Sequence, residues 1–110
     1  MHDHRWSGSE KKIARRAFDT ALESALAKIM AEFKAKAAAA MSPSDMWDIE
    51  DWLRLRRREV DELFDYRYSV LTLVLGRLIA EGLLDEGQLV GLAEEKLVQI
   101  RRDASVTRRA

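Results

Sequence analysis

The run SEKKIARRAFDTALESALAKIMAEFKAKAAAA, residues 9–40, decides the fold of this chain. It contains no glycine or proline, and its apolar side chains recur at three- and four-residue steps from Ile13 to Phe33. That spacing places one apolar stripe along a helix, and the closing run of alanines favours its extension. Ser7 and Glu10 fit a capping box, so we expect the helix to begin near Ser9 and to run without a break.

The length of this helix predicts the shape of the molecule. A straight helix over residues 9–40 is about 48 Å long at 1.5 Å per residue. A compact globule of 110 residues is only about 35 Å across. We therefore expect an elongated molecule whose protruding apolar stripe is covered by a second copy. Ala17, Ala21 and Ala25 would let a helix of that copy approach closely. Two-fold dimers are the commonest oligomers, so an all-α homodimer is predicted.

A second helix is predicted to fold back on the first. Ser42 fits an N-cap, Pro43 the first helical position, and Asp45 complements the helix dipole. The positions expected to face the core are Met46, Ile49, Leu53, Val60, Leu63 and Phe64, a stripe that Arg56 and Arg57 interrupt. A kink or short connection is expected near residues 65–69.

The rest of the chain is predicted to form a small C-terminal helical head. Residues 70–75 are apolar enough for a buried strand, but the pattern continues at helical length to a C-cap at Gly82. A turn with one short helix and a last helix from about 93 to 102 should follow. We expect one domain over residues 1–110, with long helices at about 9–64, the head at about 66–102 and a frayed tail at 103–110.

Composition excludes several classes of chemistry. The chain has no cysteine, so disulfides and thiolate sites are ruled out. His2 and His4 are the only histidines, and they lack a third ligand at suitable spacing, so we expect no metal site and no cofactor. No catalytic motif is present, and no segment fits a signal peptide or a membrane span. A non-enzymatic cytoplasmic protein without membrane insertion is predicted.

Two groups of arginines raise the alternative of nucleic-acid binding. One comprises Arg54, Arg56, Arg57 and Arg58, and the other Arg101, Arg102, Arg108 and Arg109. Lys+Arg and Asp+Glu both number 19, so the net charge gives no general attraction to phosphate. Acidic residues flank the first group on the same helix and would repel phosphates. A solvated, self-paired helix face is the preferred interpretation, and no nucleic-acid partner is expected.

The tryptophan and arginines of the second helix predict an interface instead. Trp47, Asp51, Arg54 and Arg58 share one helical face by their spacing, and Trp and Arg dominate the energetics of interfaces. Asp51 and Arg57 are six residues apart, about 240° around the helix, so they cannot pair within it. If they meet, one of them must come from another helix or another subunit.

The same segment carries a family resemblance. The motifs are WDIEDWLRLRRREVD (47–61), YRYS (66–69) and EGLL (81–84), with WSGSEKKIA (6–14) and AFD (17–19) near the start and LAEEKL (92–97) near the end. Together they resemble the fluorescence recovery protein family of cyanobacteria and its homologues in other bacteria, over nearly the whole chain.

This resemblance implies a non-enzymatic all-α homodimer that binds the photoactivated orange carotenoid protein, mainly through the C-terminal domain of that protein. It would speed the return to the inactive orange form and so end quenching of phycobilisome fluorescence. The functional Trp, Asp and Arg of the family match Trp47, Asp51 and Arg57. Trp47 is then expected to be an aromatic anchor, and Asp51 with Arg57 a polar pair that holds the dimer.

Two departures from the family pattern keep a second reading open. Glu50 stands where the family often has histidine, and Leu73 and Leu75 stand where it often has phenylalanine. The alternative is a homodimeric helical adaptor of a non-cyanobacterial bacterium with a different partner, such as a signalling protein. In either reading the residues expected at the dimer or partner interface are Trp47, Glu50, Asp51, Arg54, Arg57 and Leu73.

Overall fold

The computed structural model describes residues 5–109, with side chains to residue 108. The described chain forms four α-helices and two short 3-10 turns: α1 (Gly8–Ala39), α2 (Pro43–Leu63), η2 (Tyr68–Val70), α3 (Leu71–Ala80), η3 (Glu86–Leu89) and α4 (Glu94–Arg109). No strand is formed between residues 5 and 109, so the all-α prediction is confirmed. None of these helices is both long and apolar enough to cross a membrane.

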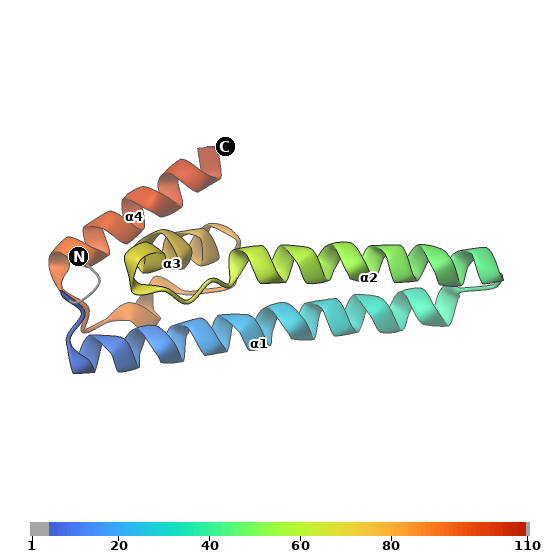
Figure 1. Ribbon diagram of the computed structural model, residues 1–110, viewed down its shortest axis with the longest axis horizontal. Coiled ribbons are helices and arrows are strands. Elements are labelled where there is room, and N and C mark those ends of the chain that lie inside the picture. The colour runs from blue at the N-terminus through green and yellow to red at the C-terminus, as the bar shows by residue number, and fades with distance from the viewer. Residues whose placement is uncertain (1–4, 110) are drawn as a thin grey trace.

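The molecule is elongated, as the length of its first helix predicted. Its principal extents are 53 × 27 × 25 Å. Figure 1 shows α1 and α2 side by side along the long axis, with α3 and α4 gathered at the end where α1 begins. We call residues 23–63 the arm and residues 5–22 with 64–109 the head.

Local sequence sets the starts of both long helices. The Ser7 hydroxyl accepts from the backbone N–H of Glu10, and the Glu10 carboxylate accepts from the backbone N–H of Ser7, which completes the predicted capping box. Ser42 and Asp45 form a second capping box, with Pro43 at the first position of α2. These reciprocal bonds satisfy backbone donors that a helix end leaves free.

The hydrophobic core lies in the head. Its largest fully buried side chains are Leu71, Leu75, Leu78, Leu89 and Ile100. Ala17 and Ala21 of α1 belong to the same core. The expectation that these alanines receive a second copy was therefore wrong, because the chain's own head covers them.

Two further expectations are corrected by packing. The segment 103–109 is not frayed: α4 continues to Arg109, Ala104 is buried, and the Thr107 hydroxyl donates to the Asp103 carbonyl at 2.9 Å. Ala104 is held because Gly76 of α3 has no Cβ, and one built there would lie 2.9 Å from the Ala104 nitrogen. Met46, expected to face the core, is 52% exposed.

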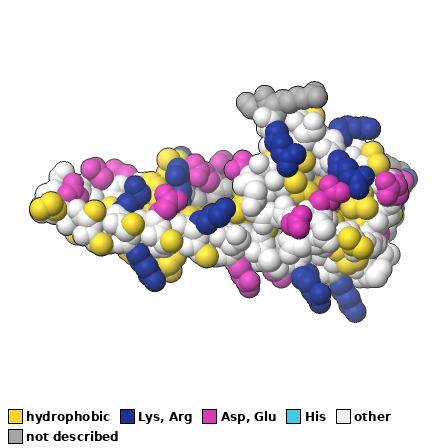
Figure 2. All heavy atoms as spheres, turned by 180° about the vertical axis from the view of Figure 1, so that it is seen from behind, with side chains coloured by type: hydrophobic (Ala, Val, Ile, Leu, Met, Phe, Trp, Pro, Cys, Tyr) yellow, Lys and Arg dark blue, Asp and Glu magenta, His cyan; other side chains and the backbone are white. Residues whose placement is uncertain are grey.

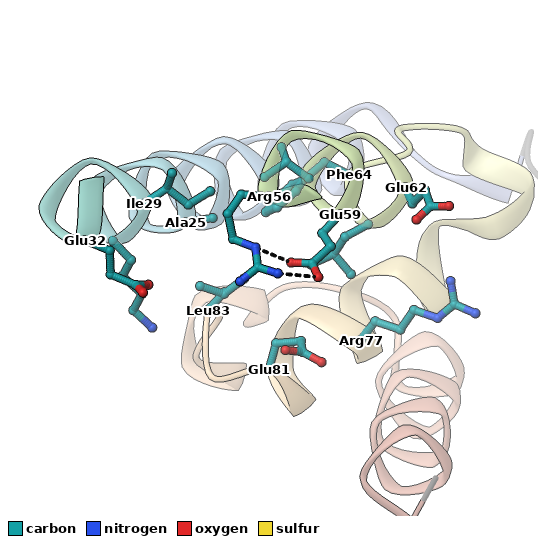
Figure 3. Close-up of a pocket in the computed structure, with 13 residues that line it drawn as sticks. Ala25, Ile29, Glu32, Arg56, Glu59, Glu62, Phe64, Arg77, Glu81 and Leu83 are labelled. Atoms are coloured by element: carbon teal, nitrogen blue, oxygen red, sulfur yellow. Dashed lines mark hydrogen bonds and ion pairs between the residues drawn. The ribbon is translucent and has the colours of Figure 1, made fainter. Parts of the chain in front are cut away.

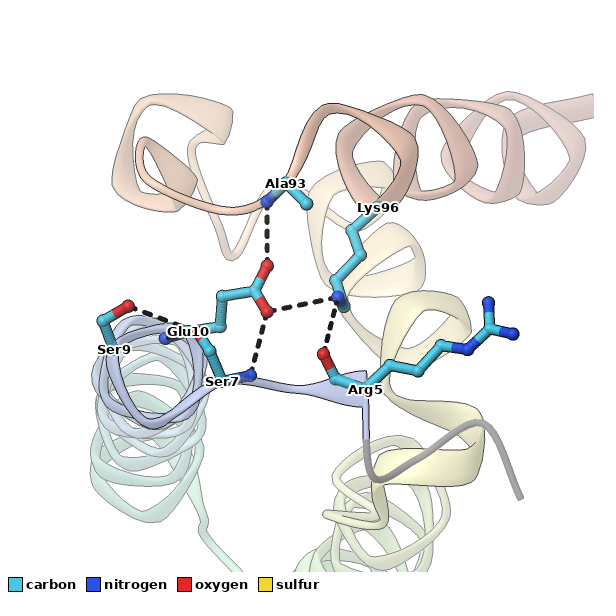
Figure 4. Close-up of polar contacts among 6 residues, drawn as sticks. All are labelled: Arg5, Ser7, Ser9, Glu10, Ala93 and Lys96. Atoms are coloured by element: carbon cyan, nitrogen blue, oxygen red, sulfur yellow. Dashed lines mark hydrogen bonds and ion pairs between the residues drawn. The ribbon is translucent and has the colours of Figure 1, made fainter.

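A buried ion pair ties the start of α1 to α4 (Figure 4). Glu10 accepts from the backbone N–H of Ala93 at 2.8 Å and from the Lys96 ammonium at 3.2 Å, and Lys96 also donates to the Arg5 carbonyl at 3.3 Å. Burial alone would raise the pKa of Glu10, but the N–H groups of Ser7 and Ala93 and the Lys96 ammonium lower that pKa to about 2. Glu10 therefore stays ionised and joins the two ends of the head.

Candidate interaction surface

The arm keeps large apolar side chains on its surface. No residue of α2, all of which is described, is buried. The most exposed large apolar side chains of its two helices are Leu26 at 49%, Met30 at 54%, Met46 at 52%, Trp47 at 58% and Leu55 at 47%. Figure 2 shows hydrophobic side chains spread along the arm between charged ones. Large exposed apolar side chains gathered on one part of a molecule mark candidate sites of protein interaction, so the arm is the leading candidate.

Part of this apolar surface forms an open groove near the turn between α1 and α2. The groove has a volume of about 480 Å³. Its lining is almost wholly apolar and comprises Phe33, Ala37, Ala40, Met41, Ser42, Pro43, Met46 and Ile49. Met41, at the turn itself, is 93% exposed. The groove has the shape and chemistry to receive an apolar side chain from another protein surface.

The predicted interface residues of α2 lie on two adjacent stripes. Met46, Glu50, Leu53 and Arg57 follow one another at four, three and four residues, so Arg57 lies on the stripe that begins at the groove. Trp47, Asp51, Arg54 and Arg58 make the neighbouring stripe with the same spacing. The structure therefore brings five of the six predicted residues to one side of one helix.

Charge pairing on these stripes is incomplete within the chain. Arg54 pairs with Glu50 across one helical turn at 3.3 Å. Asp51 and Arg57 are exposed, and no ion pair joins them to each other or to another group among residues 5–108. An exposed pair such as Arg54–Glu50 contributes well under about 1 kcal/mol to folding. The free charges of Asp51 and Arg57 remain available to another chain.

Leu73 is not brought to this surface. It is half-buried on α3, in the head. Trp47 lies near the start of α2, and sixteen residues of helix, about 24 Å, separate it from Leu63 at the end that meets the head. A single contact of ordinary size could include Leu73 only together with the head end of α2.

A cleft at the joint between arm and head was not foreseen (Figure 3). It has a volume of about 590 Å³. Arg56 and Glu59 of α2 form an ion pair at 2.9 Å at its edge, and Arg77 of α3 and Glu81, which directly follows α3, lie on the other side. Arg56 also lies 5.8 Å from the Trp52 ring centroid. The sequence signal was Arg56 itself, which interrupts the apolar stripe of α2 because its stem covers apolar surface while its head pairs with Glu59.

The described residues hold no group of three or more His, Cys, Asp or Glu side chains suited to a metal ion. His2 and His4, considered and set aside as metal ligands, lie outside the described residues. The candidate site that the structure presents is the exposed outer side of the arm, which carries Trp47, Asp51 and Arg57.

Comparison with known proteins agrees with this architecture. A family model described as photoprotection regulator fluorescence recovery protein matches residues 6–104. The fluorescence recovery protein of Synechocystis is 32% identical over 96 residues, which cover 87% of this chain and 88% of that protein. The crystal structures of the fluorescence recovery proteins of Fremyella diplosiphon and Synechocystis both superpose with a TM-score of 0.86 at 32% identity, covering 91% of this chain and 98% of theirs.

Proposed function

The chain belongs to the fluorescence recovery protein family of photoprotection regulators, and we propose that it binds the photoactivated form of an orange-carotenoid-type protein and returns it to the inactive orange form. In a cell with phycobilisomes this action would end the quenching of their fluorescence. The proposed mechanism makes and breaks no covalent bond: the regulator binds the photoactivated form, and contacts that strengthen in the transition state between the two forms lower the barrier to reversion.

The observation that supports a binding role is the unfinished surface of the arm. Trp47 is 58% exposed although a tryptophan is among the most favourable side chains to bury at an interface. Arg57 lies further along the stripe that begins at the apolar groove, and it has no acidic partner among the described residues. Covering such a surface with a second protein lowers the free energy, because apolar area is removed from water and the unpaired charges form ion pairs.

We further propose that two copies pair through their arms, antiparallel, about a two-fold axis that passes beside residue 54. In this register Asp51 faces the partner's Arg57, and Glu50 faces the partner's Arg58. A two-fold interface repeats each contact, so these two pairings supply four complementary contacts. This arrangement gives partners to Asp51 and Arg57, which lie on neighbouring stripes of one helix but do not pair with each other.

A charge swap tests the dimer. Asp51→Arg or Arg57→Asp alone should shift the protein toward monomer in sedimentation-velocity experiments, because each places like charges opposite one another. The combined variant should restore the dimer. Asp48→Arg, which lies on neither stripe, is the matched control and should leave the dimer intact. A combined variant that stays as monomeric as its parents would contradict the register.

The regulatory activity is tested by the rate of dark reversion. Adding the protein to the red, photoactivated form of an orange-carotenoid-type protein should accelerate its return to the orange absorption spectrum, and Trp47→Ala should reduce that acceleration. An unchanged reversion rate at saturating concentration of the wild-type protein would exclude this function. If the dimer still formed, the alternative of a helical adaptor with a different partner would be favoured. Glu50 and Leu73, which depart from the family pattern, would agree with that alternative.

A further inference from the structure

A basic ridge occupies the first turns of α1, in the head and away from the surface of the arm. It consists of Lys11, Lys12, Arg15 and Arg16, all exposed. At 100° per residue these four side chains cover about 140° of the helix, on the side facing away from Ala14 and Ala17. In Figure 2, Lys and Arg side chains project from the lower edge of the head, along which α1 runs in Figure 1.

Acidic residues close to the ridge are already engaged. Glu10 is buried with Lys96, Asp65 pairs with Arg67, and Asp19 pairs with Arg15 at 3.1 Å. Lys12 and Arg16 make no ion pair among the described residues. The ridge therefore presents net positive charge, although the chain as a whole has a formal net charge of zero.

The segment 65–68, Asp-Tyr-Arg-Tyr, holds half of the ridge in place. The Lys11 ammonium lies 5.0 Å from the Tyr68 ring centroid, and the Arg15 guanidinium lies 4.5 Å from that of Tyr66 and 5.5 Å from that of Phe18. The Tyr66 hydroxyl donates to the Lys11 carbonyl at 3.5 Å. Burial and the neighbouring Tyr68 hydroxyl raise the pKa of Tyr66 to about 12, so it remains a neutral donor. Cations fixed on aromatic rings lose less entropy when they bind an anion.

We propose that this ridge docks a short acidic segment of the protein partner. This inference takes one point from the proposed function, namely that the partner is a protein. The chemistry of recognition is argued from the ridge alone. The cations span six residues, about 7.5 Å of helix rise, which matches carboxylates on one or two turns of a partner helix. The pairs Lys11–Arg15 and Lys12–Arg16 have the four-residue spacing that such carboxylates also have.

The length and surroundings of the ridge favour a protein over the other polyanions. Asp19 and Glu23 follow on the same helix and end the positive stretch, whereas a nucleic-acid backbone would need a longer track of cations. The large exposed apolar residues of α1 are Leu26 and Met30, both in the arm, so the ridge lacks the apolar side chains with which basic helices enter a membrane surface.

The experiment uses a fluorescein-labelled oligo-glutamate peptide, with binding to the full chain followed by fluorescence anisotropy. The wild type should bind, with affinity that falls as salt is added. Lys12→Glu combined with Arg16→Glu should weaken binding about tenfold or more, since each reversal replaces an attraction with a repulsion. Lys28→Glu combined with Lys34→Glu, the same charge change on the arm, is the control and should bind like wild type.

The outcomes separate this inference from the proposed function. Equal peptide binding by all three proteins, or none by the wild type, would overturn the ridge as a docking site. So would displacement of the peptide by single-stranded DNA, or by vesicles of anionic lipid, at lower concentrations than by unlabelled oligo-glutamate. If the wild type binds the peptide and the ridge variant does not, the ridge is supported as a docking site. This holds even if dark reversion is unaffected and the proposed function fails.

Discussion

The head and the arm are built from the same kind of helix but differ in what covers their apolar faces. In the head, residues from α1, α3, η3 and α4 bury one another, and five large side chains are fully enclosed. In the arm, two helices face each other and leave their outer apolar side chains exposed, with no buried residue anywhere in α2. The head stabilises itself, whereas the arm presents surface that only another molecule can cover. The following changes, ordered from the largest expected effect to the smallest, test this division.

Leu78→Ala should cost the most stability, because Leu78 is fully enclosed in the head. We expect the free energy of unfolding in urea to fall by about 4 kcal/mol, from lost burial and the cavity left behind. Leu55→Ala is the matched control on the arm, where the side chain is 47% exposed, and should cost about 1 kcal/mol or less. Equal losses for the two variants would mean that head and arm do not differ in packing.

Glu10→Gln should destabilise the head by about 3 kcal/mol, since it leaves the Lys96 ammonium buried without its counter-charge. The pKa of Glu10 is lowered in the folded chain from 4.5 to about 2, so its contribution is complete above pH 4.5 and is lost as the pH falls toward 2. Urea unfolding of the wild type should show this loss in that window, and the variant should not. Asp19→Asn, which breaks an exposed pair, is the control. A variant with the wild-type acid profile would contradict the role of Glu10.

Gly76→Ala tests the contact between α3 and α4. A Cβ at this position would lie 2.8 Å from the Asp103 Cβ and 2.9 Å from the Ile100 carbonyl oxygen, so the two helices would have to separate. We expect a loss of about 2 kcal/mol in urea unfolding. Gly8→Ala, where a Cβ would meet nothing within 4 Å, serves as control and should not destabilise. An unchanged stability for Gly76→Ala would show that α4 packs more loosely than described.

Trp47→Ala should have the smallest effect on the fold, because the side chain is mostly exposed. Circular dichroism of the dilute protein should show unchanged helix content, and the stability of the isolated chain should fall by less than about 0.5 kcal/mol. Association, measured by sedimentation, should weaken. Wholesale loss of helix would instead make Trp47 part of a folding core and would remove the distinction between arm and head.

Local sequence signals predicted the helices, whereas the features that were not predicted depend on contacts between residues distant in the sequence. Ser7 with Glu10 and Ser42 with Pro43 defined the starts of α1 and α2, because a cap depends on residues within one turn. The end of α4 was misplaced because Ala104 is held by Gly76, which is remote in sequence. The bond between Glu10 and Lys96 joins residues 86 positions apart, which no local pattern reveals.

For the candidate site, the sequence predicted where residues lie on the helix but not which groups they contact. Helix spacing was enough to place Trp47, Asp51, Arg54 and Arg58 on one face of α2, whereas Glu50 and Arg57 lie on the neighbouring stripe. Their partners remain a prediction, because the contacts proposed for Asp51 and Arg57 involve a second chain. Leu73 came only from the family resemblance, and the structure places it on a different element.

The pair of Glu10 and Lys96 also bears on the order in which the chain folds during synthesis. The two helices of the arm are neighbours in sequence, so they can pair as soon as residue 63 has left the ribosome. The head cannot close until Lys96 has emerged, because the first turn of α1 is anchored through Glu10 to Ala93 and Lys96 at the start of α4. Contacts between distant parts of a chain form slowly. We therefore expect the two helices of the arm to pair before the head closes.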